Sequence, residues 1–156
     1  MIEHGNMVTT RQMAVAAGVS EGTIFNVFAD KDELIGAVLD HVIDQEPFER
    51  SITAIDPDLP FGQRLVRATD LIQQRTVGIW QLVSQFGKPQ GGHRPMPPSE
   101  ALAALLASEP DQLRIPADEA AGVLRSLALA MSHPMLNATS PSAEHVVDVF
   151  LNGVRA

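Results

Sequence analysis

Apolar residues recur along this chain at the three- and four-residue intervals that are typical of amphipathic helices. No stretch sustains the apolar–polar alternation of a strand, and no Asn-Gly turn lies between two alternating segments. Eleven prolines divide the pattern, and we expect the helices to lie between them. The pattern therefore predicts an all-α fold.

Two short helices and a turn are predicted near the N-terminus. The first spans Thr10–Ala17, where one of the threonines at positions 9 and 10 caps the first turn. Gly18 suits the left-handed conformation that ends a helix. Ser20 then caps a second helix over Glu21–Phe28.

A third helix is predicted directly afterwards. Asp30 and Glu33 have the spacing of a capping box, in which each side chain satisfies a backbone donor of the other residue. We expect this helix to end before Pro47, since proline breaks a helix interior. Its apolar stripe consists of Leu34, Ile35, Val38, Leu39, Val42 and Ile43.

The C-terminal part is predicted to hold further helices. Gly87–Pro98 has the composition of a loop, which is long for a compact domain. Ser140 is expected to cap the last helix, with Pro141 at the first helical position. The predicted helices are Pro60–Gln74, whose pattern continues or kinks through Phe86, one capped by Ser99, Ala117–Met131, and a last one through Val154.

The most specific spacing is Ala14-x3-Gly18-x5-Ile24. Two helices that cross steeply need a small residue at their contact, a sharp turn, and an aliphatic side chain from the second helix. This is the arrangement of a helix-turn-helix, whose second helix enters the major groove of DNA. An ordinary helical hairpin is the alternative, because such hairpins are common. The other residues expected to be buried here are Met13, Ala17, Val19 and Val27.

Composition narrows the function classes. The chain has 156 residues and a net charge of −8, which argues against a general polyanion binder but allows a local DNA-reading face. Cysteine is absent, which excludes disulfides and thiolate metal sites and fits a cytoplasmic location. No apolar run approaches the ~20 residues that cross a bilayer, so no membrane association is expected.

Two short motifs of the N-terminal segment are more specific still. These are Gly18-Val19-Ser20-x-Gly22-Thr23 and Phe28-x-x-Lys31-x-x-Leu34, and the segment Gly5–Leu39 that holds them resembles the tetracycline-repressor-like (TetR) family of bacterial transcription regulators. The resemblance implies a homodimer that binds operator DNA through residues 1–45 and a small-molecule effector through residues 46–156. It also implies a repressor, dimerised through residues 117–135 and 141–154 and released from DNA by an apolar or aromatic effector.

Three features depart from the family pattern. The family has another helix before the helix-turn-helix, and Met1–Met7 are too few to form it, so we expect this first helix to be largely absent. Glu21, Phe25 and Val27 stand where the family often has phosphate-contacting Lys, Tyr and Tyr or His. Residues 1–40 carry two basic and six acidic side chains, a net charge of 2 − 6 = −4, which weakens phosphate neutralisation. The alternative function is therefore an all-helical ligand-binding or interaction protein that has lost DNA binding.

The resemblance implies four phosphate-contacting residues. Thr10 and Arg11 lie where the start of the first helix can hold a phosphate, although Thr10 could serve only as a cap. Thr23 can donate a hydroxyl to a phosphate. Lys31 matches the lysine of the family that contacts phosphate, with a solvated surface charge as the alternative.

Two more implied residues bring the second helix close to the bases. Gly22 allows the backbone to approach DNA closely. Asn26 faces away from Ile24 and Val27, so it can read a base edge, preferably that of adenine.

A candidate effector site lies on the middle helices. Its apolar character suits an apolar or aromatic ligand, with plain core packing as the alternative for each residue. Trp80 is the strongest candidate because it is the only tryptophan. The candidate residues are Ile72, Thr76, Ile79, Trp80 and Val83, which Leu105, Leu127 and Met131 can face.

Catalytic and metal motifs were sought in the same sequence. The five histidines do not have a recognised zinc spacing, and we find no nucleophile elbow, phosphate loop or dinucleotide fingerprint. We therefore expect no cofactor, no metal and no enzymatic activity. A small helical-bundle enzyme remains the third hypothesis, without a motif behind it.

Overall fold

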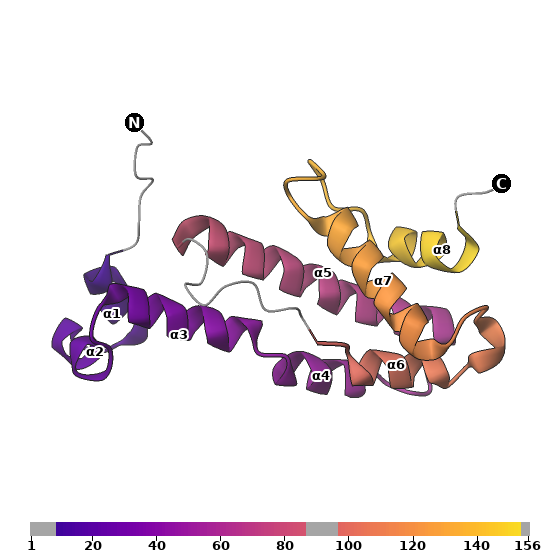
Figure 1. Cartoon of the computed structure of the whole chain (residues 1–156), viewed down its shortest axis with the longest axis horizontal. Helices are drawn as coiled ribbons and strands as arrows, with labels where there is room; N and C mark the ends of the chain where they lie inside the picture. Colours follow the sequence, from indigo (N-terminus) through magenta and orange to yellow (C-terminus); the bar gives the residue numbers. More distant parts are fainter. Residues whose placement is uncertain (1–8, 87–96, 154–156) are drawn as a thin grey trace. The chain divides into compact units, whose positions relative to one another are not determined.

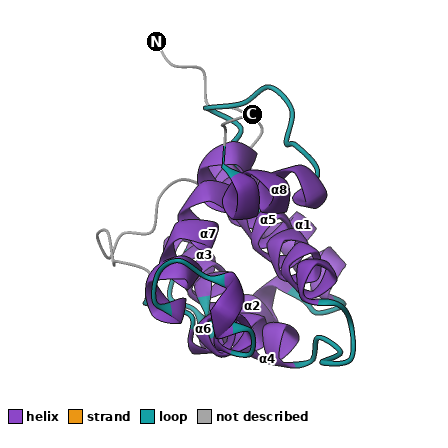
Figure 2. Cartoon of the chain, turned by 90° about the vertical axis from the view of Figure 1, so that its right-hand side faces the viewer, coloured by secondary structure: helices purple, strands orange, loops and turns teal. Residues whose placement is uncertain are grey.

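The computed structural model describes residues 9–86 and 97–153, and every regular element within these ranges is a helix (Figures 1 and 2). The predicted all-α fold is thereby confirmed. The chain forms two compact units, one of which contains the residues up to Ile43 and a segment that begins at Gln81. The other contains Asp44–Trp80 and the C-terminal segment. Across the described ranges, no helix is long and apolar enough to span a membrane.

The first unit contains α1 (Thr10–Ala17), α2 (Glu21–Val27) and α3 (Lys31–Ile43). The Thr9 hydroxyl caps α1 by accepting from the Gln12 N–H at 3.2 Å. The Gln12 side chain accepts in return from the Thr9 N–H at 2.8 Å, which completes a capping box.

The predicted capping box of α3 forms with one difference. The Asp30 carboxylate accepts from the Glu33 N–H at 2.8 Å, but the Glu33 carboxylate accepts from Ala29, one residue before the cap. α2 ends one residue earlier than predicted, because Phe28 adopts an extended conformation with φ at −117°. These end positions follow from local backbone donors and acceptors, which is why the sequence predicts them to within a residue.

The core of the first unit is small. Ala14, Ile24 and Leu34 are buried, and Met13 and Phe28 pack against them. α1 therefore contacts α2 through the small and aliphatic residues that the spacing predicts.

The prediction that three further residues are buried is wrong. Ala17 and Val19 are exposed, and Val27 is 68% exposed. Ala17 and Val27 are the last residues of their helices, and Val19 lies in the turn, so none of them faces the α1–α2 contact. Burial depends on what packs over a residue, which apolarity alone does not specify.

The second unit contains most of the remaining helices and the larger core. α5 is one unbroken helix, so the predicted pattern after Gln74 continues without a kink. The last residues of α5, from Gln81, belong to the first unit. The elements are α4 (Glu46–Thr53), α5 (Phe61–Phe86), α6 (Glu100–Ala107), the 3-10 turn η1 (Pro110–Gln112), α7 (Ala117–Ser132) and α8 (Ala143–Asn152).

α6 packs against both α4 and α7, and α7 packs against α8 (Figure 1). Large aliphatic side chains fill the space between these helices and α5. Those with almost no exposed surface are Leu65, Leu102, Leu106, Leu124 and Val146.

α3 ends at Ile43, before Pro47 as predicted. Two other expectations about prolines are wrong. Pro47 does not lie between helices but in the first turn of α4, where its missing N–H needs no partner. Pro141 is not the first helical residue, because Ser142 caps α8 by accepting from the His145 N–H at 3.3 Å. The predicted loop Gly87–Pro98 lies largely outside the described residues, as does the region before Thr9.

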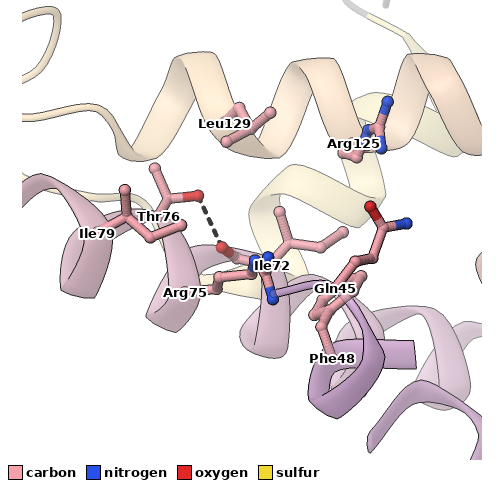
Figure 3. Close-up of a pocket in the computed structure, with 8 residues that line it drawn as sticks. All are labelled: Gln45, Phe48, Ile72, Arg75, Thr76, Ile79, Arg125 and Leu129. Atoms are coloured by element: carbon pink, nitrogen blue, oxygen red, sulfur yellow. Dashed lines mark hydrogen bonds between the residues drawn. The ribbon is translucent and has the colours of Figure 1, made fainter. Parts of the chain in front are cut away.

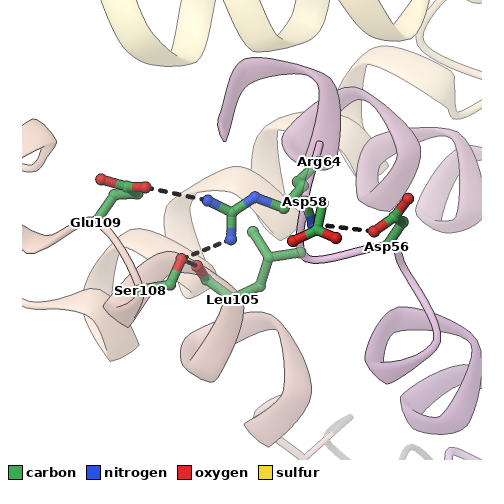
Figure 4. Close-up of polar contacts among 6 residues, drawn as sticks. All are labelled: Asp56, Asp58, Arg64, Leu105, Ser108 and Glu109. Carbon is green, nitrogen blue, oxygen red and sulfur yellow. Dashed lines mark hydrogen bonds and ion pairs between the residues drawn. The ribbon is translucent and has the colours of Figure 1, made fainter. Parts of the chain in front are cut away.

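A buried arginine connects α5 to the end of α6 (Figure 4). Arg64 is 8% exposed and donates to the Ser108 hydroxyl at 2.8 Å and to the Glu109 carboxylate at 3.3 Å. Its guanidinium also lies 5.6 Å from the centre of the Phe61 ring. These contacts satisfy a charge that would be costly to bury alone.

Candidate nucleic-acid interface and ligand cavity

The turn between α1 and α2 holds the two helices in a defined relation. Gly18 has φ at 69°, the left-handed conformation that glycine adopts without strain. The Val19 N–H donates to the Ala14 carbonyl at 3.0 Å, and the Ser20 hydroxyl accepts from the Thr23 N–H at 3.1 Å. The exposed face of α2 is therefore presented by a turn with satisfied hydrogen bonds.

The predicted DNA-binding side chains lie at the surface of this unit. Arg11, Gly22, Thr23 and Asn26 are exposed, and Thr10 and Lys31 are partly exposed. Gly22 and Asn26 are one turn apart on α2, so they share a face of that helix. The structure thus brings Gly22, Thr23 and Asn26 together on α2, with Thr10 and Arg11 at the start of α1 and Lys31 at the start of α3.

Several of these side chains have no internal role. Within the described ranges, the Arg11, Asn26 and Lys31 side chains form no hydrogen bond or ion pair. Thr10 does not cap α1, because Thr9 does. Thr23 differs, since its hydroxyl shares a 2.7 Å hydrogen bond with the Ser20 hydroxyl.

Gly22 is a glycine that the fold does not require. Its backbone is ordinary right-handed helix, unlike that of Gly18. A Cβ atom added at Gly22 would come no closer than 3.8 Å to its nearest neighbour, the Ser20 hydroxyl. The fold of this unit therefore gives no reason for a glycine at this exposed position, and the position is open to close approach from outside.

The electrostatics of this face are mixed. Glu21 lies in the first turn of α2, and Asp32 and Glu33 lie in the first turn of α3, where they complement the positive ends of the helix dipoles. Phe25 is 47% exposed without a hydroxyl to donate. Arg11 and Lys31 therefore supply the positive charge among the described residues of this face.

A cavity lies between α4, α5 and α7 within the second unit (Figure 3). Its free volume is about 20 Å³, which is room for about one water molecule, and it is partly open to the surface. The lining side chains are Gln45, Phe48, Ile72, Arg75, Thr76, Ile79, Arg125 and Leu129.

Three predicted ligand-binding residues, Ile72, Thr76 and Ile79, line this cavity. The Thr76 hydroxyl donates to the Ile72 carbonyl at 2.7 Å (Figure 3). Trp80 does not line it, and its ring centre instead lies 4.4 Å from that of His133.

The other four predicted ligand-binding residues also lie outside the cavity lining. Leu105, Leu127 and Met131 are partly buried and pack against the main core. Val83 lies in the part of α5 that belongs to the first unit.

Sequence reasoning missed both arginines of the cavity, as well as Gln45, Phe48 and Leu129. Arg75 is three residues after Ile72 and four before Ile79, so helical spacing placed it on the same face of α5. Gln45 and Phe48 could not be found in this way, because α4 itself was not predicted.

Glu49 connects α4 to α6 beside this cavity. Its carboxylate accepts from the Ala101 N–H at 2.7 Å and from the Gln45 side chain at 3.0 Å. Burial by itself would raise the pKa of Glu49, but hydrogen bonds from Ser99, Ala101 and Gln45, together with the charge of Arg125, hold that pKa below its usual value.

Comparison with known families agrees with the predicted resemblance. Residues 1–38 match the family model described as bacterial regulatory proteins, tetR family. No curated protein and no solved structure matches the chain. The matched segment contains the helix-turn-helix and reaches into α3, so the resemblance to this family is confirmed for the DNA-binding segment.

Proposed function

We propose that this chain, whose residues 1–38 match the tetR family model, is a TetR-type DNA-binding transcription regulator, and that it acts as a homodimeric repressor whose operator binding is relieved by a small effector. The observation that carries the proposal is the α1–α2 pair, with the exposed Arg11 and Asn26 and the partly exposed Lys31, whose side chains form no hydrogen bond or ion pair within the described ranges. We further propose that the chain acts as a regulator and not as an enzyme, and that it binds DNA in the cytoplasm.

We assign the DNA contacts by chemistry. Thr10, Arg11 and Lys31 lie at helix starts, where cationic and hydroxyl groups and the helix dipole favour phosphate. Thr23 adds a hydroxyl, which would exchange its Ser20 partner for a phosphate oxygen. Asn26 reads a base edge, since an amide pairs well with adenine in the major groove.

The proposed roles divide the chain near the first boundary between the two units, which falls after Ile43. Residues 1–45 would bind DNA, and residues 46–156 would bind the effector and form the dimer. Exposed apolar side chains on the last two long helices support a dimer contact there, namely Val123 at 46% and Leu151 at 37% exposure. An effector that alters the spacing of the two reading heads would then change operator affinity.

The test is selection of binding sites from a random DNA pool, followed by titration of variants. We expect palindromic sites with half-sites about one helical turn or a multiple of it apart. Lys31→Ala should weaken binding to all sequences and lower the salt slope by about 1. Asn26→Ala should relax the preference at one base pair, at a cost of roughly 1–3 kcal/mol. If the two variants lose affinity equally across operator variants, the assigned roles are wrong.

A second function is favoured by a specific observation. Glu21, Phe25 and Val27 are exposed on or beside the reading helix, and none of them can donate to a phosphate. An all-helical ligand-binding protein that has lost DNA binding would tolerate these residues. A selection that enriches no sequence, with a chain that still binds small ligands, would favour this second function.

A further inference from the structure

We propose that the cavity between α4, α5 and α7 binds a small carboxylic acid with an apolar ring, whose carboxylate pairs with Arg75 and Arg125. The inference rests on the proposed function, because it names the chemical class of the effector. An acid differs from the apolar or aromatic effector that the sequence predicts, since the predicted site contained no charged residue.

The walls of the cavity favour a flat apolar body. Phe48 from α4, Ile72 and Ile79 from α5 and Leu129 from α7 supply the apolar lining (Figure 3). Small-molecule sites combine such a lining with a few placed polar groups. Here the polar groups come from three helices, so a ligand that contacts them would bridge α4, α5 and α7.

Two arginines are among the lining residues, Arg75 on α5 and Arg125 on α7. Arg125 donates to the Pro97 carbonyl and forms no ion pair with any described carboxylate. Arg75 lies 5.2 Å from the centre of the Phe48 ring and donates to the Asp44 carbonyl at 2.8 Å. Guanidinium groups bind carboxylates through parallel hydrogen bonds, so two of them with an apolar lining favour an organic anion.

Two carboxylates, those of Asp44 and Glu49, act on the charge of Arg75. The Asp44 carboxylate accepts from the Glu46 N–H at 3.1 Å. Glu49 accepts from Ala101 and Gln45, which fixes both of its oxygens toward α6 and the start of α4. It lowers the net positive charge near the cavity without pairing with Arg125. Burial lowers the pKa of Arg75, while Asp44 and Glu49 oppose that shift.

The side-chain oxygen of Gln45 is a buried acceptor in the cavity lining. The Gln45 amide nitrogen donates to the Glu49 carboxylate at 3.0 Å and to the Pro98 carbonyl at 2.9 Å, but its buried oxygen has no hydrogen-bond partner among the described residues. An unmet buried acceptor is costly, so a ligand hydroxyl at this point gains affinity. A hydroxylated aromatic acid therefore fits better than the acid without the hydroxyl.

The site also supplies a route to the DNA-binding segment. The free volume of about 20 Å³ is smaller than a ring, so we expect binding to widen the cavity by moving its lining side chains or α4. Asp44 and Gln45 are the two residues between α3 and α4, and both contact this site. A ligand carboxylate bound to Arg75 would compete with the Asp44 carbonyl for that guanidinium. Such binding would therefore weaken a contact of the segment that connects α3 to α4.

The test uses the full chain without DNA and three probes: benzoate, 4-hydroxybenzoate and 3-phenylpropionate, each beside its primary amide. Calorimetric titration should show saturable binding of the acids, tightest for 4-hydroxybenzoate, and at least tenfold weaker binding of the amides. Arg125→Met should weaken the acids at least tenfold, about 1.4 kcal/mol, and leave the amides unchanged. Arg67→Met, an exposed arginine of α5 outside the cavity, is the matched control and should change neither.

Three results would overturn the site: no acid binds, the amides bind as tightly as the acids, or Arg125→Met leaves acid affinity unchanged. Circular dichroism of each variant separates lost binding from lost folding. Operator release is then measured separately. Arginine-dependent acid binding without operator release would leave the site standing and refute the proposed regulation. Operator release by a compound whose binding does not depend on Arg125 would support regulation by an effector and refute this cavity as its site.

Discussion

At the scale of single residues, the fold and the proposed function make different demands on Gly22. A Cβ at this position would meet nothing closer than 3.8 Å, so Gly22→Ala should leave stability unchanged or raise it by up to ~1 kcal/mol through better helix propensity. The same methyl group should weaken operator binding by about tenfold, about 1.4 kcal/mol, if DNA approaches the backbone here. Urea unfolding and operator titration of one preparation measure both effects.

Gly36→Ala is the matched control for this experiment. Gly36 lies within α3, and an added Cβ there meets nothing within 4 Å. It should gain similar helix propensity without changing DNA affinity. An unchanged operator affinity for Gly22→Ala would show that Gly22 has no contact role.

At the scale of elements, Glu49 connects the helices α4 and α6. The pKa of Glu49 in the folded chain lies below the ordinary value of a glutamate, near 4.3. The ionised carboxylate therefore stabilises the fold above about pH 4.3, and this stabilisation is lost as the pH falls from there to the folded pKa. Glu49→Gln should therefore reduce stability at neutral pH and flatten the loss of stability on acidification. Urea midpoints at about pH 7 and about pH 4, measured for the parent chain and for Glu49→Gln, show how much stability each loses on acidification.

The control for Glu49 is Glu119→Gln, which changes an exposed carboxyl on α7. It should keep the acid dependence of the parent chain. If Glu49→Gln and the parent lose stability in parallel as pH falls, the hydrogen bonds to α6 do not stabilise the ionised form.

The helices differ in how far the sequence could predict them. α1, α2 and α3 were predicted because their ends depend on near neighbours, such as Thr9 with Gln12 and Asp30 with Glu33. α4 was missed because proline was treated as a terminator, although it is tolerated in a first turn. Capping by near neighbours can thus be predicted from the sequence. Whether a proline ends one helix or begins the next depends on which backbone N–H groups the fold needs as donors.

The candidate sites divide in the same way. The DNA-binding residues came from a motif whose spacing is local, and the structure places them at the surface as expected. The cavity depends on contacts between segments far apart in the chain, so only its α5 face, with Ile72, Thr76 and Ile79, was predicted. Arg125 and Gln45 meet that face only through tertiary packing, which no periodicity reveals.

At the scale of the whole molecule, the proposed dimer depends on what remains exposed after each chain has built its own core. Leu124, Val146 and Val147 belong to the internal core, so they are not free to meet a partner. Val123 on α7 and Leu151 on α8 are exposed at 46% and 37%. Because α7 and α8 pack against each other, these two side chains are the better test positions.

Val123→Glu with Leu151→Glu should convert a dimer into a folded monomer, since neither side chain fills the internal core and two carboxylates cannot be buried in an apolar contact without cost. Light scattering at micromolar concentration measures the mass, and circular dichroism checks that the helices persist. Val38→Glu adds the same charge at an apolar side chain of α3 that is 40% exposed, and should leave the mass of the dimer unchanged. A parent chain that is already monomeric at this concentration would contradict the proposed assembly, and with it the reading of a palindromic operator by two linked heads.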